Sequence, residues 1–140
     1  MAEQLVKDWM TTDVIVVPSN ATLPRAKRLM RDRSVRHLPV VDDGRLVGII
    51  TWGDVREASA SDSTTLSIFE LHTLLDQLSV RQIMTRNPIT VCPITTIASA
   101  AHLMLQHKIG GLPVIDHKGR LVGIITESDI FQMVVLGHAA

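Results

Sequence analysis

The sequence has one cysteine, no tyrosine, 3% aromatic residues and no long apolar run. Because Cys92 stands alone, an internal disulfide and a metal site built from several cysteines are excluded, and we expect a half-buried, unreactive thiol. No run reaches the roughly 18 apolar residues of a membrane-spanning helix, and the opening Met-Ala-Glu-Gln lacks a secretion-signal pattern. These absences predict a soluble, cytoplasmic protein with no membrane partner.

An excess of charge of either sign is also missing. Fourteen lysines and arginines balance fourteen aspartates and glutamates, so the formal net charge is zero. Proteins that bind nucleic acids usually carry a basic excess, so we expect no nucleic-acid partner. The hydrophobic fraction of 46% is enough for a core, which must be built mainly from Val, Ile, Leu and Met.

Arrangements typical of catalysis or metal binding are missing too. The sequence shows no Ser-His-acid or Cys-His pattern that would predict a nucleophile and its base. His102 and His107 are five residues apart, which places them about 140° apart around an ideal helix, whereas helical zinc pairs have a spacing of four. We therefore expect no enzyme activity, no catalytic residues, no metal and no resident cofactor.

What the chain does contain is one pattern written twice. The first copy spans Met10–Asp54 and the second Met84–Asp129, offset by 74 positions at first and by 75 from Gly44 and Gly119 onward. A repeat of this length is one supersecondary unit, too small to bury its apolar face well alone. Two copies therefore predict two half-domains packed about a pseudo-twofold axis, with two related clefts.

Apolar spacing and turn residues predict an α/β fold with the order β-α-β-β-α in each repeat. We expect repeat 1 at residues 1–62, an amphipathic linker helix at 63–79 and repeat 2 at 80–140. A short helical segment at Leu5–Met10 precedes the first strand. The predicted strands are Val14–Val17, Leu38–Val41, Leu46–Ile50, Ile89–Val91, Leu112–Ile115 and Leu121–Ile125. The predicted helices begin at Leu23, after Thr51, at Thr96 and at Glu127. Thr22 caps the first of these helices, and the last ends near Gly137.

The doubled motif resembles a pair of cystathionine-β-synthase-type (CBS) domains, the Bateman module. The matching stretches are Leu38-Pro39-Val40-Val41-Asp42 with residues 48–54, and Leu112-Pro113-Val114-Ile115-Asp116 with residues 123–129. The openings Trp9-Met10-Thr11 and Ile83-Met84-Thr85 also fit, so the resemblance covers essentially the whole chain. The stretch around Glu70-Leu71 and Val80-Arg81-Gln82-Ile83-Met84 is similar, more weakly, to acetoin-utilisation-type CBS proteins.

This resemblance implies a non-catalytic regulatory module that binds AMP, ADP or ATP in clefts between the repeats and acts on an unidentified protein partner. It also implies a homodimer, which the sequence supports with the apolar run Phe131, Met133, Val134, Val135 and Leu136 on the last helix. Two alternatives stay open: a sensor of S-adenosylmethionine, and a ligand-free dimerisation or interaction scaffold.

The candidate site centres on Thr51-x-x-Asp54 and Thr126-x-x-Asp129, where a strand gives way to a helix. A structural interpretation suffices for both motifs, because Thr at the N-cap and an acid in the first turn stabilise a helix by about 1 kcal/mol. The functional interpretation, which the resemblance favours, has free N–H groups and Thr binding phosphate while the carboxylate accepts from the ribose hydroxyls.

The resemblance extends the site to the mouths of the strands. Arg36 and His37 would contact phosphate in the cleft whose ribose-binding acid is Asp129, whereas Gly110 and Gly111 replace them in the second copy. The two clefts are therefore expected to be unequal. Two strand openings would flank the adenine, although core packing explains their side chains equally well: Asp13-Val14-Ile15 and Pro88-Ile89-Thr90.

Overall fold

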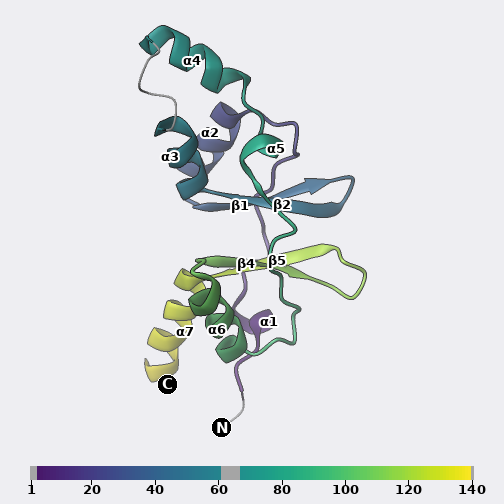
Figure 1. The fold of residues 1–140 in the computed structure, drawn as a ribbon. Helices are drawn as coiled ribbons and strands as arrows, with labels where there is room; N and C mark the ends of the chain where they lie inside the picture. The colour runs from purple at the N-terminus through teal and green to yellow at the C-terminus, as the bar shows by residue number, and fades with distance from the viewer. Residues whose placement is uncertain (1–2, 61–66, 140) are drawn as a thin grey trace. The chain divides into compact units, whose positions relative to one another are not determined.

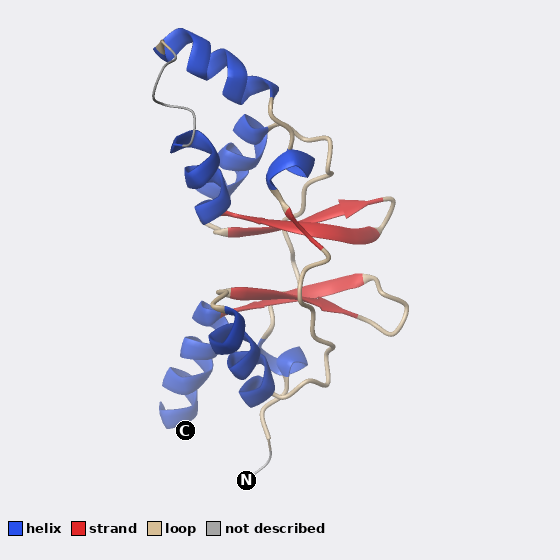
Figure 2. Cartoon of the chain, viewed as in Figure 1, coloured by secondary structure: helices blue, strands red, loops and turns tan. Residues whose placement is uncertain are grey.

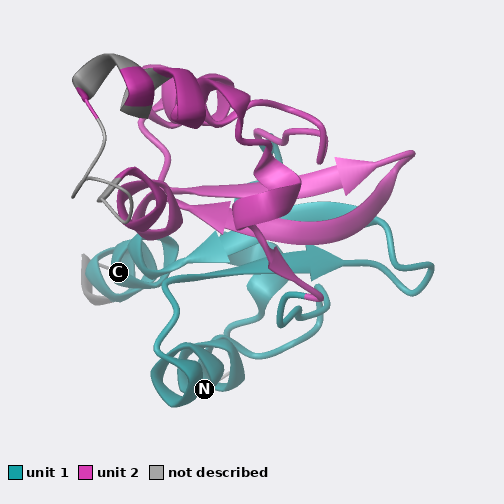
Figure 3. Cartoon of the chain, turned by 45° about the horizontal axis from the view of Figure 1, so that its top comes forward, with its two compact units in different colours: residues 1–14, 88–140 teal, residues 15–87 magenta. Residues whose placement is uncertain are grey.

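The computed structural model describes residues 3–60 and 67–139. The chain divides into two compact units, unit 1 formed by Met1–Val14 with Pro88–Ala140, and unit 2 formed by Ile15–Asn87 (Figure 3). Unit 1 is therefore assembled from the two ends of the chain, while unit 2 is one continuous segment. Within the described residues, no helix combines the length and the apolar character needed to cross a membrane.

Unit 2 contains a three-stranded antiparallel sheet in the order β1-β2-β3, with helices α2 and α3 on one face (Figures 1 and 2). The β1–β2 turn places Asp43 and Gly44 at positive φ, 51° and 78°, which fits the tolerance of Asp and Gly for this region. Its elements are α2 (Leu23–Arg33), β1 (His37–Asp42), β2 (Arg45–Thr51), α3 (Trp52–Ala60), α4 (Ile68–Gln77), α5 (Val80–Ile83) and β3 (Thr85–Arg86).

Unit 1 repeats the plan around a two-stranded antiparallel sheet, β4-β5 (Figure 1). Helix α6 is capped by Thr96, whose side chain accepts from the Ser99 N–H, as Thr22 caps α2 by accepting from the Arg25 N–H. The elements are α1 (Val6–Trp9), α6 (Ile97–His107), β4 (Gly111–Ile115), β5 (Leu121–Thr126) and α7 (Glu127–Ala139). The predicted fold class, two repeats of mixed α/β structure, is confirmed.

Each unit has its own core of buried aliphatic side chains. Met30 in unit 2 and Met104 in unit 1 occupy equivalent helix positions and are 2% and 5% exposed. Leu38 and Leu112, at the equivalent strand position, are fully buried. These matched positions explain the sequence repeat, because each unit needs the same apolar shape between its sheet and its helices.

Each unit also contains one of the two Met-Thr segments. Met10-Thr11, just before the first repeat, belongs to unit 1, and Met84-Thr85, just before the second repeat, belongs to unit 2. Thr11 forms an antiparallel bridge with Ile124, and β3 pairs with β2 through Thr85 and Ile49. The methionine before each threonine lies over a glycine: a Cβ added at Gly123 would lie 2.6 Å from Met10 Sδ. At Gly48 the same distance to Met84 Sδ is also 2.6 Å.

Two predicted strands are reduced to single bridges. Instead of strands at Val14–Val17 and Ile89–Val91, only Val17 pairs with Val40 and only Val91 pairs with Val114, both parallel. The reason lies in the partner strand. The N–H of Val17 donates to the Pro39 carbonyl. Proline has no N–H, so Pro39 cannot donate a hydrogen bond to the residues before Val17, and the parallel ladder cannot extend in that direction. Pro113 has the same effect on Val91.

Three smaller predictions need correction or comment. Helix α7 continues through Gly137 to Ala139, because Gly137 keeps a negative φ and does not form a left-handed cap. Cys92 is exposed, and a hydrogen bond with Thr95 lowers the pKa of its thiol. The linker helix forms as α4 and belongs to unit 2; residues 61–66, at its predicted start, lie outside the described residues.

Candidate functional site

In unit 1 the Thr126-x-x-Asp129 motif joins the end of β5 to the first turn of α7. The Thr126 N–H donates to Asp129 Oδ2 at 2.9 Å, and the Thr126 hydroxyl donates to the same oxygen at 3.2 Å. The second carboxylate oxygen, Oδ1, accepts from the hydroxyl of Thr11 at 3.3 Å. Three donors thus orient this half-buried carboxylate.

In unit 2 the Thr51-x-x-Asp54 motif has a different hydrogen-bond pattern. The Thr51 N–H donates to Asp54 Oδ2 at 2.9 Å, and the Asp54 N–H donates back to Thr51 Oγ1 at 3.1 Å. This reciprocal pair is a helix-capping box. The structural interpretation of the motif therefore holds in unit 2, while the Thr126 hydroxyl is turned toward its carboxylate.

The strand mouths lie beside these motifs within each unit. In unit 2 the Trp52 N–H donates to the Arg36 carbonyl at 2.9 Å, and His37 pairs with Thr51 across the β1–β2 ladder. Arg36 is exposed and His37 is half-buried. The Arg36 guanidinium is therefore free to reach outward from a backbone that is fixed at the edge of the motif.

The same main-chain pattern recurs in unit 1 without the side chains. There the Glu127 N–H donates to the Gly110 carbonyl at 3.1 Å, and Gly111 pairs with Thr126. The backbone frames of the two motifs are thus equivalent, and their difference in charge comes from the replacement of Arg36 and His37 by two glycines.

The remaining predicted site residues are divided between the units. Asp13 is exposed and Val14 is half-buried in unit 1, whereas Ile15 is half-buried and belongs to unit 2. Pro88, Ile89 and Thr90, all half-buried, belong to unit 1. A site that combines Arg36 and His37 with Asp129 draws residues from both units, and that combination stays a prediction.

Sequence reasoning missed the role of Thr11. Its hydroxyl contacts Asp129 although 118 positions separate the two residues. The available signal was the recurrence of Met-Thr before each repeat, which suggested a family motif but gave no partner for the threonine.

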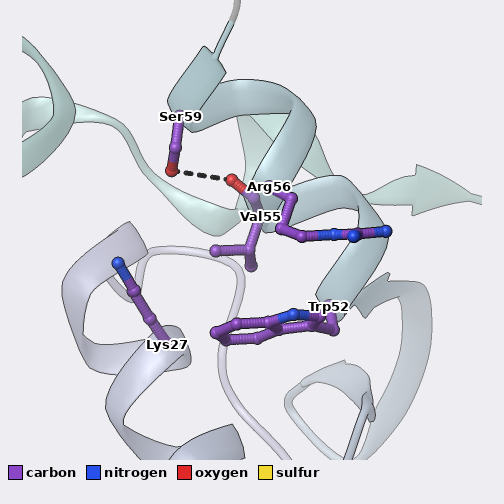
Figure 4. Close-up of a pocket in the computed structure, with 5 residues that line it drawn as sticks. All are labelled: Lys27, Trp52, Val55, Arg56 and Ser59. Atoms are coloured by element: carbon purple, nitrogen blue, oxygen red, sulfur yellow. Dashed lines mark hydrogen bonds between the residues drawn. The ribbon is translucent and has the colours of Figure 1, made fainter.

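A depression of about 220 Å³ in unit 2 lies between α2 and α3 (Figure 4). Lys27 of α2 forms one side, and Trp52, Val55, Arg56 and Ser59 of α3 form the other. The Ser59 hydroxyl donates to the Val55 carbonyl at 2.8 Å. None of the predicted site residues lines this depression, although Trp52 and Val55 directly follow Thr51 and Asp54 in the chain.

Comparison with known proteins identifies the repeated unit. The family model described as CBS domain matches residues 6–61 and 80–136. A CBS domain-containing protein of Dictyostelium discoideum is 37% identical over 138 residues, covering 94% of this chain and 91% of that protein. Several other relatives are enzymes of which the chain spans only about a quarter. One is an inosine-5'-monophosphate dehydrogenase of Korarchaeum cryptofilum, which is 35% identical over 130 residues, covering 93% of this chain and 24% of that protein.

Solved structures show the same fold. The CBS domain pair of protein MJ0100, in complex with 5'-methylthioadenosine and S-adenosylmethionine, matches with a TM-score of 0.80 and 31% identity, covering 99% of this chain and all of the other. The protein CBSX2 in complex with AMP matches with a TM-score of 0.80 and 29% identity, covering 95% and 97%. A putative acetoin utilization protein of Vibrio cholerae gives 0.82 and 31%, covering 97% and 95%, in agreement with the similarity noted from the sequence.

Proposed function

This chain belongs to the CBS-domain family, and we propose that it is a regulatory module that binds an adenine nucleotide: AMP, ADP or ATP. The observation that carries the proposal is the group formed by Thr11, Thr126 and Asp129, where hydroxyls and a carboxylate meet at the start of α7. The complexes of similar proteins with AMP and with S-adenosylmethionine indicate an adenosine-containing ligand.

The proposed chemistry follows from the hydrogen-bonding capacity of these groups. Asp129 Oδ1 has two lone pairs and accepts from Thr11 alone, so it can also accept from a ribose hydroxyl, whereas both lone pairs of Oδ2 are used by Thr126. The hydroxyls of Thr11 and Thr126 rotate freely and can turn toward a ligand. Arg36 and His37 supply the charge for phosphate, and the segments Asp13–Ile15 and Pro88–Thr90 supply main-chain groups and apolar surface for the adenine.

Calorimetric titration with AMP, ADP, ATP and S-adenosylmethionine tests this proposal, with Asp129→Ala and Asp54→Ala as the matched pair. Loss of a charge-assisted acceptor should weaken nucleotide binding at its own site by about 1.5–3 kcal/mol, roughly 10- to 150-fold. Loss of a first-turn acid should cost the helix only about 0.3–1 kcal/mol. If no ligand in the series binds the folded protein, the scaffold alternative is correct.

A preference for S-adenosylmethionine over all three nucleotides would instead favour the second alternative. That alternative has direct support in the complex of the similar CBS pair with this ligand. The sulfonium compound carries no phosphate, so Arg36→Gln should leave its affinity unchanged while weakening nucleotide binding. The two ligands are therefore distinguished by one variant as well as by their affinities.

We also propose that the module forms a homodimer through α7 and transmits its ligand state to a separate protein. Phe131, Val134, Val135 and Leu136 are 65%, 46%, 67% and 49% exposed on this one helix. A second copy would cover this apolar face. Light scattering should give the dimer mass at micromolar concentration, and Phe131→Glu should shift the mass toward the monomer; a monomeric wild-type protein would contradict the proposal.

A further inference from the structure

We propose a second ligand site in unit 2, away from the Thr51-x-x-Asp54 motif of that unit, which binds a small oxyanion through Arg81 and Arg86. The two arginines line a depression of about 370 Å³ together with Ser19, Asp42 and Asn87. Leu46, at the start of β2, also lines it, whereas Thr51 ends that strand. The depression therefore lies toward the β1–β2 turn, at the opposite end of β2 from the proposed nucleotide motif.

Ser19 gives this site a fixed base. It is 3% exposed, and its N–H and hydroxyl donate to the two oxygens of Asp42 at 2.9 and 2.5 Å. The Ser19 oxygen also accepts from Arg81 Nη2 at 3.4 Å, while the Ser19 carbonyl accepts from the Arg81 N–H at 2.9 Å. One buried serine thus positions the carboxylate and the guanidinium without a direct ion pair between them.

The charged side chains that line the depression carry a net positive charge, because two arginines accompany one aspartate. Among the residues that the structure describes, ion pairs within 4.0 Å join Arg31 to Asp32 and Arg120 to Asp116, and none involves Arg81 or Arg86. Two arginines and one aspartate therefore line the depression, and the aspartate oxygens already accept from Ser19. A guanidinium presents a planar set of donors that matches phosphate or carboxylate oxygens, so the excess charge suits an oxyanion.

Asn87, which follows Arg86, adds a polar side chain to the lining of the depression. Asn87 has φ of 50°, a left-handed conformation that non-glycine residues adopt infrequently and Asn tolerates best. Its side-chain amide can donate to an anion held by the arginines. Met84 and Val47 add apolar wall to the depression, so the ligand can carry a small carbon skeleton behind its anionic group.

The second repeat does not reproduce this site. Thr12 stands 74 positions before Arg86, and Pro93 stands 74 positions after Ser19, so a guanidinium and the serine bridge are both absent there. The equivalent acid, Asp116, is paired with Arg120 at 3.4 Å. The arginine pair is therefore a property of unit 2 and not a consequence of the repeated fold.

Amide chemical-shift titration of the full chain with inorganic pyrophosphate, and separately with citrate, tests the site and distinguishes phosphate from carboxylate. Saturable shifts should appear at Ser19, Arg81 and Asn87 for at least one of the two anions. Arg86→Gln should weaken that binding about 10-fold or more, as expected for loss of a charge-assisted hydrogen bond. Arg28→Gln, on the exposed face of α2, is the matched control and should bind as the wild type does.

Each outcome decides the question. No saturable shift at these amides with either anion, or equal affinity in Arg86→Gln and wild type, overturns the site. Because Arg86→Gln leaves the Ser19 contacts intact, its thermal unfolding should match the wild type and show that any loss is local. Asp129→Ala should leave the shifts at Ser19 and Arg81 unchanged; loss of these shifts in Asp129→Ala would assign the anion to the proposed nucleotide site instead.

Discussion

The Thr11 hydroxyl donates to Asp129 Oδ1 at 3.3 Å, which joins the start of the chain to its last helix. The equivalent residues in unit 2 are Thr85 and Asp54. Asp54 exchanges hydrogen bonds with Thr51, and within residues 3–60 and 67–139 no hydrogen bond joins Asp54 to Thr85. The two motifs are thus alike in sequence but differ in how their carboxylates are held.

Thr11→Val removes this hydroxyl while keeping a β-branched side chain that suits the bridge to Ile124. The free energy of unfolding should fall by about 0.5–1 kcal/mol, the low end for a hydrogen bond, because Thr11 is exposed. Urea unfolding measures the change. Thr85→Val is the matched control and should have a smaller effect, since Thr85 has no corresponding bond to Asp54; equal losses in the two variants would contradict this account.

The second prediction concerns Gly48 and Gly123, which pack against Met84 and Met10. A Cβ at Gly48 would lie 2.6 Å from Met84 Sδ and 2.9 Å from the Thr85 carbonyl oxygen. The sulfur can move, but the carbonyl belongs to a paired strand. Gly48→Ala and Gly123→Ala should therefore each destabilise the protein by about 1–3 kcal/mol, measured by urea unfolding.

Gly53→Ala is the matched control for both variants. A Cβ there meets only Thr51 Oγ1 at 3.6 Å, an ordinary contact. Because Gly53 lies within α3, alanine should raise the free energy of unfolding by about 0.5–1 kcal/mol. A neutral result at Gly48 and Gly123 would show that the Met-Thr segments can move away from the sheets at little cost.

The sequence predicted the parts of the fold that depend on neighbouring residues. Both hairpins were expected from an apolar strand, an acidic turn with Gly44 or Gly119, and a second apolar strand, and the structure confirms them. The caps at Thr22 and Thr96 were also local. The packing of Met10 against Gly123 and of Met84 against Gly48 could not be predicted, because it depends on contacts between residues far apart in the chain.

The candidate site shows the same division. The Thr-x-x-Asp pairs were visible from spacing, and their hydrogen bonds to the helix start are present in both units. The contact of Thr11 with Asp129 and the bridge from Ser19 to Asp42 join distant segments, and no local pattern indicated either one. The missing strand at Val14–Val17 also has a distant cause. Its β-branched residues favour a strand, but Pro39 on the partner strand has no N–H to extend the pairing.

Acid should weaken the contribution of Asp42 to stability. Hydrogen bonds from the Ser19 side chain and backbone lower the pKa of Asp42 below its ordinary value of 3.8, and Arg81 adds a smaller effect in the same direction. A lowered folded-state pKa means that this stabilisation is present above pH 3.8 and is lost as the pH falls through the folded value. The unfolding free energies of wild type and Asp42→Asn should therefore differ at pH 7 and converge below pH 3.8.

Ser128→Ala, at an exposed position on α7, provides a comparison for that experiment. Its effect on the free energy of unfolding should be small and should not change across the same pH range. If the difference between wild type and Asp42→Asn is constant from pH 7 to the acid limit, the Ser19 hydrogen bonds do not discriminate between the charged and neutral carboxyl.

The last prediction concerns the inequality of the two nucleotide sites. If the partners cross between repeats, the Asp129 site gains Arg36 and His37, whereas the Asp54 site faces Gly110 and Gly111, which offer only backbone groups. A charge-assisted bond from Arg36 to phosphate contributes about 1.5–3 kcal/mol, enough to separate the affinities of the two sites by a decade or more. AMP should therefore fill the Asp129 site first, and its affinity there should fall with added salt.

Arg36→Gln should remove this preference for AMP but leave binding of adenosine, which has no phosphate, nearly unchanged. Arg28→Gln changes the net charge equally at an exposed position on α2 and controls for general electrostatics. Calorimetric titration of AMP and adenosine into the three proteins separates the phosphate contribution from the rest of the ligand. A co-crystal with AMP at full occupancy beside Asp54 and none beside Asp129 would reverse the assignment of the stronger site.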